Sequence, residues 1–144
     1  MNIIMFLNLC KKYLTKLKIF NKLEYILKVE PHTKPRMTIR DKWKNRPCVS
    51  AYYAFKDSIN FEAKRVKLPQ LPDKIELIQF FISMPLSWSK KKRELMNGTP
   101  HKQVCDIDNL CKSLYDSLLK SDSHIYSVKI EKFWAEIGYI RIII

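Results

Sequence analysis

The sequence predicts a single α+β domain in which two or three helices pack on a mixed β-sheet. First, a chain of 144 residues with 47% hydrophobic content is long enough for one domain with a real core. Second, apolar residues recur at helical spacing in one stretch and alternate or run together, as in strands, in others. Third, the elements follow one another as strands, helices and strands, an order typical of α+β domains.

Four strands are expected. Residues 23–30 predict the first strand, and residues 74–84, rich in Ile and Phe between flanking prolines, predict the clearest one. Near the end of the chain, residues 125–135 and 139–144 also have strand composition. Because Gly138 separates these last two segments, we expect them to form a hairpin.

Two helices are expected before the most distinctive stretch of the chain. Residues 52–66 predict one helix, with Tyr53, Ile59 and residues 61–63 as its packing positions. A short second helix follows the 74–84 strand, where Ser87 is a suitable N-cap and Gly98 a suitable terminator.

A third helix carries the densest group of carboxylates in the chain. Its apolar residues recur at i, i+3, i+4, i+7, i+8 and i+11: Ile107, Leu110, Cys111, Leu114, Tyr115 and Leu118. Asp108, Lys112 and Asp116 are four residues apart and share one face. Asp106 lies at the helix start, where a carboxylate suits the free N–H groups. These charges predict either a cap with an ion-pair ladder, or ligands for a hard cation such as Mg²⁺.

The rest of the chain is strongly basic. Net charge is +13 and the pI is about 9.7, which favours an anionic polymer or membrane surface as partner. Clustered Lys and Arg side chains are expected to bind phosphates: Lys34, Arg36, Arg40 and Lys42 in a Pro-bounded arm over residues 34–46, and Lys90, Lys91, Lys92 and Arg93 in a second cluster. Trp43 in the arm could stack on an unpaired base or pack in the core. Trp88 and Trp134 are expected to be core residues.

Residues 1–22 are expected to form a basic amphipathic extension outside this domain, which would cover residues 23–144. Its apolar run is too short to span a bilayer and lacks the flanks of a signal peptide. No stable membrane association is expected. A basic amphipathic helix can nevertheless bind a membrane surface, so a membrane-surface protein is kept as an alternative function.

The cysteines and histidines suggest a weaker alternative. The four cysteines lack a disulfide or CxxC spacing, which predicts reduced thiols in a cytoplasmic protein. His101 and Cys105, together with Cys111 or His124, could form a zinc site, but their spacing matches no usual zinc pattern.

The run Asp106-Ile107-Asp108-Asn109-Leu110-Cys111-Lys112, followed by Asp116, resembles the D-x-D-N-x-x-K-x-x-x-D signature of RusA-like Holliday-junction resolvases. The resemblance extends over roughly residues 28–143. It includes the Pro-containing basic opening at residues 34–37, residues 84–93, and then Gly98 and His101. One departure is Ser121-Asp122-Ser123-His124-Ile125, which has a shorter preceding loop and one aspartate fewer than the family's D-D-S-Q-[IV].

This resemblance implies a set of roles. Asp106, Asp108 and Asp122 would be catalytic metal ligands for Mg²⁺, with Mn²⁺ as a substitute. Lys112 would be catalytic, holding a phosphate oxygen or protonating the leaving group. Asn109 and Asp116 would support the site, with Asp116 as a candidate to orient Lys112.

The expected function is Mg²⁺-dependent cleavage of four-way or branched DNA by a homodimer, in DNA recombination and repair. The resemblance places such a protein in the cytoplasm of a bacterium, at the nucleoid, with a phage or a chromosome as its source. The alternatives are a non-catalytic basic DNA-binding protein and the membrane-surface protein.

Overall fold

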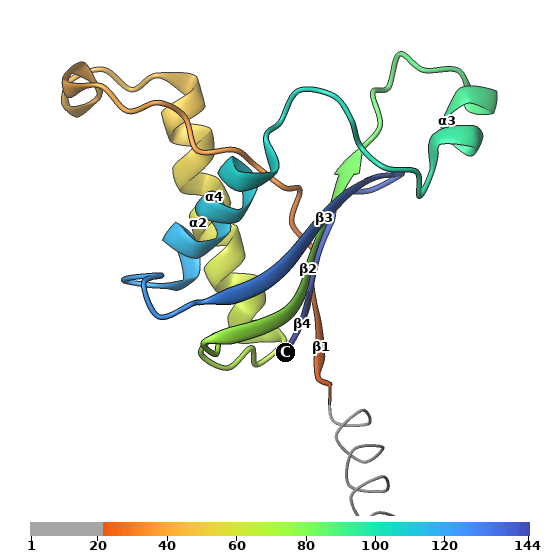
Figure 1. Ribbon diagram of the computed structural model, residues 1–144. Coiled ribbons are helices and arrows are strands. Elements are labelled where there is room, and N and C mark those ends of the chain that lie inside the picture. The colour runs from red at the N-terminus through yellow and green to blue at the C-terminus, as the bar shows by residue number, and fades with distance from the viewer. Residues whose placement is uncertain (1–21) are drawn as a thin grey trace, which may run out of the picture.

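The computed structural model describes residues 22–144, which form one four-stranded mixed sheet with helices on one face (Figure 1). The strands are β1 (Glu24–Leu27), β2 (Lys74–Ser83), β3 (Ser127–Ala135) and β4 (Tyr139–Ile143). Their order in the sheet is β1-β4-β2-β3. This confirms the predicted α+β fold class. Of the N-terminal extension predicted over residues 1–22, all but Lys22 lies outside the described residues.

The sheet is mixed because β2 has a different kind of neighbour on each side. It pairs in parallel with β3 and antiparallel with β4. The predicted hairpin of β3 and β4 is therefore wrong, since β2 lies between these consecutive strands. Three residues link the end of β3 to the start of β4 across β2. They are long enough, because the two strands are separated by two strand spacings of about 4.8 Å each. Gly138 ends the link, and a Cβ at this position would overlap the carboxylate of Glu30.

Helices α2 (Pro47–Arg65) and α4 (Ile107–Leu118) pack on one face of the sheet (Figure 1). Pro47 is the first helical residue of α2, where its missing N–H costs nothing. The buried face of α2 includes Tyr52, Phe55 and Ile59, so Ile59 was predicted correctly. Tyr53 and Phe61 are exposed, contrary to prediction. Full burial of a side chain such as Ile59 contributes roughly 1.5–3 kcal/mol, and this apolar layer fixes α4 against the sheet.

Two smaller helices lie outside this layer. The 3₁₀ helix η1 (Ile39–Lys42) lies within the Pro-bounded segment before α2, which is otherwise irregular as predicted. Helix α3 (Lys90–Met96) follows β2. Its cap is Ser89, whose hydroxyl accepts from the Lys92 N–H, rather than the predicted Ser87. Gly98 follows the helix with a φ of 77°, which a glycine adopts without strain.

Candidate active site on helix α4

Helix α4 exposes the motif side chains because its apolar stripe is held in the core. Leu110 and Leu114 are almost completely buried, and this fixes the rotation of the helix. Asp108 and Lys112 consequently face solvent. Asp106 occupies the N-cap position in extended conformation, but its side chain makes no capping hydrogen bond. The carboxylate of Asp106 is thus exposed and unused by the helix, contrary to the capping interpretation.

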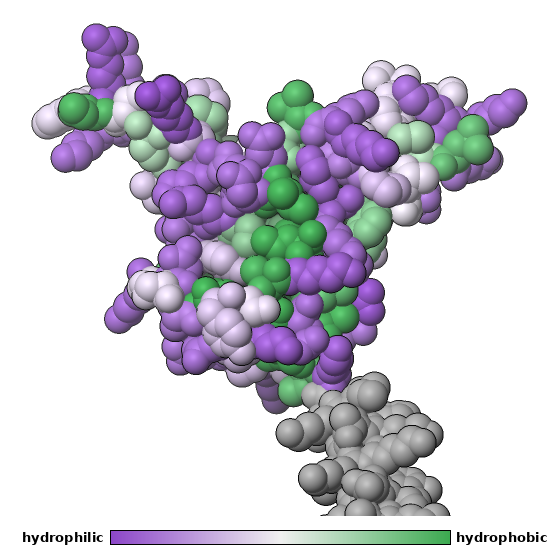
Figure 2. All heavy atoms as spheres, in the orientation of Figure 1, coloured by the Kyte–Doolittle hydropathy of each residue, from purple (hydrophilic) through white to green (hydrophobic). Residues whose placement is uncertain are grey.

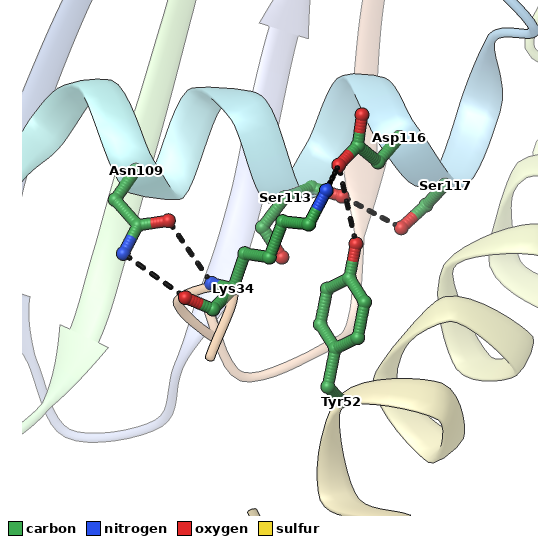
Figure 3. Close-up of polar contacts among 6 residues, drawn as sticks. All are labelled: Lys34, Tyr52, Asn109, Ser113, Asp116 and Ser117. Carbon is green, nitrogen blue, oxygen red and sulfur yellow. Dashed lines mark hydrogen bonds and ion pairs between the residues drawn. The ribbon is translucent and has the colours of Figure 1, made fainter. Parts of the chain in front are cut away.

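The ion-pair ladder expected on the exposed face of α4 is also absent from residues 22–144. No ion pair or hydrogen bond joins Lys112 to Asp108 or to Asp116 within that range. Asp116 instead accepts from Lys34 Nζ at 2.6 Å and from the Tyr52 hydroxyl at 3.4 Å (Figure 3). Asp116 therefore contacts Lys34 and Tyr52 in this structure, and not Lys112, the residue that it was expected to orient. Lys112 extends into solvent from the same face as Asp108.

Asn109 and Asp116 hold the start of the basic arm against α4 (Figure 3). The Asn109 side chain accepts from the Lys34 backbone N–H at 3.1 Å and donates to the Lys34 carbonyl at 3.2 Å. Burial and, after it, the negative charge of Asp116 raise the pKa of Tyr52 to about 12. Tyr52 therefore remains a protonated donor to Asp116. Asn109 and Asp116, the two residues expected to support the site, therefore both contact Lys34.

Asp122 lies in the loop after α4 and is exposed. Burial raises the pKa of the Cys111 thiol, and the carboxylates of Asp122 and Asp108 raise it further. Within the part of the chain that the structure describes, the side chains of Asp106, Asp108 and Asp122 make no ion pair.

Exposed, unpaired carboxylates are the donor type that Mg²⁺ prefers, and Mg²⁺ needs only one or two of them with water completing its shell. The residues therefore fit this ion. Among residues 22–144, however, no three His, Cys, Asp or Glu side chains gather into a preformed metal-binding group. This also excludes a preformed zinc site at His101 and Cys105. His124 donates to the Leu71 carbonyl instead, and Cys111 is a buried core residue.

A residue that sequence reasoning missed holds the loop in front of Asp106. Lys132 on β3 donates to the carbonyl of Cys105 at 2.6 Å and to that of Gln103 at 3.2 Å. Cys105 has a φ of 122°, which is strained for a residue with a Cβ. The strained peptide directly precedes Asp106, so Lys132 helps to set where that carboxylate lies. A lysine in a strand carries no sequence signal for such a contact.

Contacts between tilted aromatic rings attach the α3 region to the same loop. Trp88 packs on Trp134 with ring centroids 4.9 Å apart, and Trp134 packs on His101 at 4.0 Å. Lys92 Nζ lies 4.0 Å from the centre of the Trp88 ring. Trp134 is a core residue as predicted, whereas Trp88 is half-buried. Burial and, after it, the charge of Lys132 lower the pKa of His101 below its usual range.

The basic arm (residues 34–46) and the α3 region rise on either side of the start of α4 (Figure 1). Both protrusions are mostly hydrophilic at the surface, although each also carries exposed apolar side chains, and a band of apolar atoms lies between them (Figure 2). Several of the predicted phosphate-binding side chains are already paired: Lys34 with Asp116, Arg93 with Glu136, and Lys90 with Glu94 at 4.0 Å. Within residues 22–144, no ion pair is made by Arg36, Arg40, Lys42 or Lys91.

Trp43 does not pack in the core, since its side chain is 85% exposed. The sequence left two roles open for Trp43, core packing and stacking on a base, and the structure excludes core packing. No helix in residues 22–144 is long and apolar enough to cross a membrane.

Comparison with known proteins shows the family of the chain. The model of the family described as endodeoxyribonuclease RusA matches residues 28–144, which includes every motif residue on α4 and Asp122. None of the curated proteins matches the chain. With most of its length matched, the chain belongs to the RusA endodeoxyribonuclease family, whose members act on branched DNA junctions.

Proposed function

We propose that this protein is a Mg²⁺-dependent endonuclease that resolves four-way DNA junctions in recombination and repair. The observation that carries the proposal is the exposure of Asp108 and Lys112 on one face of α4, between two basic protrusions. Such an arrangement can receive a phosphate backbone and bring one phosphate to the carboxylates. Membership of an endodeoxyribonuclease family supports the same reaction.

In this proposal Asp106, Asp108 and Asp122 would hold the metal, and Mn²⁺ would substitute for Mg²⁺. The bound ion would supply charge stabilisation at the scissile phosphate and activate a water. Lys112 would contact a non-bridging phosphate oxygen or donate a proton to the leaving 3′ oxygen. Its position one turn from Asp108 on the same exposed face allows either role. Asn109 and Asp116 would act indirectly, by holding the basic arm beside the site.

A four-way junction has two equivalent strands to cut, so we propose a homodimer with one site in each protomer. Because its substrate would be DNA, we propose that the protein acts in the cytoplasm of a bacterial or phage-infected cell. Sedimentation velocity with and without a synthetic junction tests the dimer. A species that remains monomeric on the junction contradicts it.

The deciding experiment is Asp108→Asn, which preserves the side-chain size but removes an anionic ligand. We expect junction binding to persist while cleavage in Mg²⁺ falls by about a hundredfold or more. Asp57→Asn is the matched control, because Asp57 is an exposed aspartate on α2. Cleavage by Asp108→Asn at the wild-type rate would remove Asp108 from the site. If the wild-type protein binds junctions but cuts none, the protein is the non-catalytic DNA-binding protein.

A further inference from the structure

The basic arm has a defined conformation although it projects from the domain. Arg46 donates to both carboxylate oxygens of Asp41 and also to the Arg36 carbonyl. Asp41 in turn accepts from the Thr38 backbone N–H. These bonds close the tip on itself, and at the root of the arm the Asn109 side chain holds both backbone groups of Lys34.

Two large apolar side chains project from this closed tip. Trp43 is 85% exposed and Ile39 is 84% exposed, one at each end of the η1 turn. They contribute little to folding, because neither is buried. Arg40 and Lys42 lie between them in sequence and make no ion pair within residues 22–144. The tip therefore offers an aromatic ring and an aliphatic side chain next to two available cations.

This combination matches single-stranded or unpaired DNA better than a closed duplex. Cations on the arm attract phosphates of any DNA form. A tryptophan ring adds affinity only where the face of a base is free, because inside a duplex both faces are covered by neighbouring base pairs. Free base faces occur at a branch point, in a gap or in a single strand.

We propose that Trp43 stacks on an unpaired or unstacked base at the branch point of the DNA, with Ile39 beside it, and so contributes to selection of branched over linear DNA. The inference rests on the DNA-binding part of the proposed function. It does not depend on metal or cleavage. Arg40 and Lys42 hold the adjoining phosphates while the ring contacts the base.

The test measures binding in EDTA, so that cleavage plays no part. For a four-way junction with a few unpaired bases at its centre, we expect Trp43→Ala to weaken binding about tenfold, and Trp43→Phe to retain most of the affinity. Binding to a linear duplex of equal length should change by less than about twofold, since phosphate contacts remain. Phe61→Ala is the matched control, because Phe61 is an exposed aromatic on α2.

A second measurement uses the unaltered chain. A 2-aminopurine placed at the branch point should change fluorescence on binding the wild-type protein, and this change should be lost with Trp43→Ala. The inference is overturned if Trp43→Ala binds junctions as the wild type does, or weakens junction and duplex equally. It is also overturned if Phe61→Ala has the same effect. A loss of cleavage with Asp108→Asn leaves all these results unchanged, so the two proposals fail separately.

Discussion

Lys34 Nζ lies 2.6 Å from Asp116 Oδ2, joining the first basic residue of the arm to the last carboxylate of the motif helix. The side chains are 32% and 29% exposed, so their ion pair is partly screened and stabilises the fold by no more than about 1 kcal/mol. Its larger consequence concerns charge. The charge of Lys34 is offset by Asp116 in the free protein, whereas Lys42 has no acidic partner among residues 22–144.

We therefore expect Lys34→Met and Lys42→Met to differ in the salt dependence of DNA binding. Lys42→Met should make the slope of log K against log salt shallower by about 0.9, the value for one phosphate contact. Lys34→Met should leave the slope unchanged. The measurement is a titration of labelled junction at several salt concentrations. If both variants lower the slope equally, Lys34 leaves Asp116 when DNA binds and contacts a phosphate.

A second prediction concerns Lys112, whose exposed side chain supports no contact in the described structure. Lys112→Met should change the free energy of unfolding by less than about 0.5 kcal/mol. Cleavage of a four-way junction should nevertheless fall by about a hundredfold or more, the scale of a lost proton donor. Lys64→Met is the control, because Lys64 is an exposed lysine near the C-terminal end of α2 and outside the proposed site. Cleavage by Lys112→Met within a few-fold of the control would contradict a catalytic role.

A third prediction follows from the contact between Lys132 and the Cys105 carbonyl. Lys132→Met removes the donor that holds this loop, so the strained Cys105 peptide should relax and Asp106 should move. We expect cleavage to fall at least about tenfold with junction binding nearly unchanged, the result of misplacing a reacting group. Hydrogen exchange of residues 102–110 should rise in the same variant.

Cys105→Gly provides a sharper form of the same test. Glycine adopts a φ near 122° without strain, which relieves about 1–3 kcal/mol, against an entropic cost of about 0.5–1 kcal/mol. Cys105→Gly alone should therefore be neutral or slightly stabilising in urea unfolding. Added to Lys132→Met, it should restore part of the lost cleavage. A double variant no more active than Lys132→Met would show that strain at Cys105 is not what Lys132 opposes.

A fourth prediction is a pH dependence of stability. The pKa of His101 is lowered in the folded protein by burial and, after it, by the charge of Lys132. Its Nδ1 has no hydrogen-bond partner within residues 22–144. The unfolded chain therefore takes up a proton at about pH 6.5, where the folded protein does not. Stability should fall as pH falls through this value and should level off above it.

Urea unfolding of the wild type and of His101→Gln between pH 5 and pH 8 measures this contribution. The other histidines, His32 and His124, are present in both proteins and cancel in the comparison. The variant should show a weaker dependence on pH over this range. Equal dependence in the two proteins would mean that His101 titrates normally when folded.

The sequence by itself determined the features that depend on near neighbours in the chain. The period of Leu110, Cys111 and Leu114 determines both the α4 helix and which of its sides is buried. Asp108 and Lys112 must then face outward, because residues four apart share a face. The two basic clusters and the motif at Asp106 could likewise be read directly, since charge and residue spacing are properties of the sequence alone.

Only the tertiary structure decided which distant groups meet. Lys34 and Asp116 are 82 residues apart, and Lys132 and Cys105 are 27 apart. The spacing of four residues favoured Lys112 as the partner of Asp116, because helical periodicity relates only residues on the same helix. In the fold, Lys34 is brought to Asp116 by the two hydrogen bonds of Asn109 to its backbone. The sheet order has the same origin, since β2 separates β3 from β4 and, as a central strand, buries Ile75, Ile78 and Phe80 in the core with the helices. Burial summed over the whole domain outweighs the local preference for a turn at Gly138.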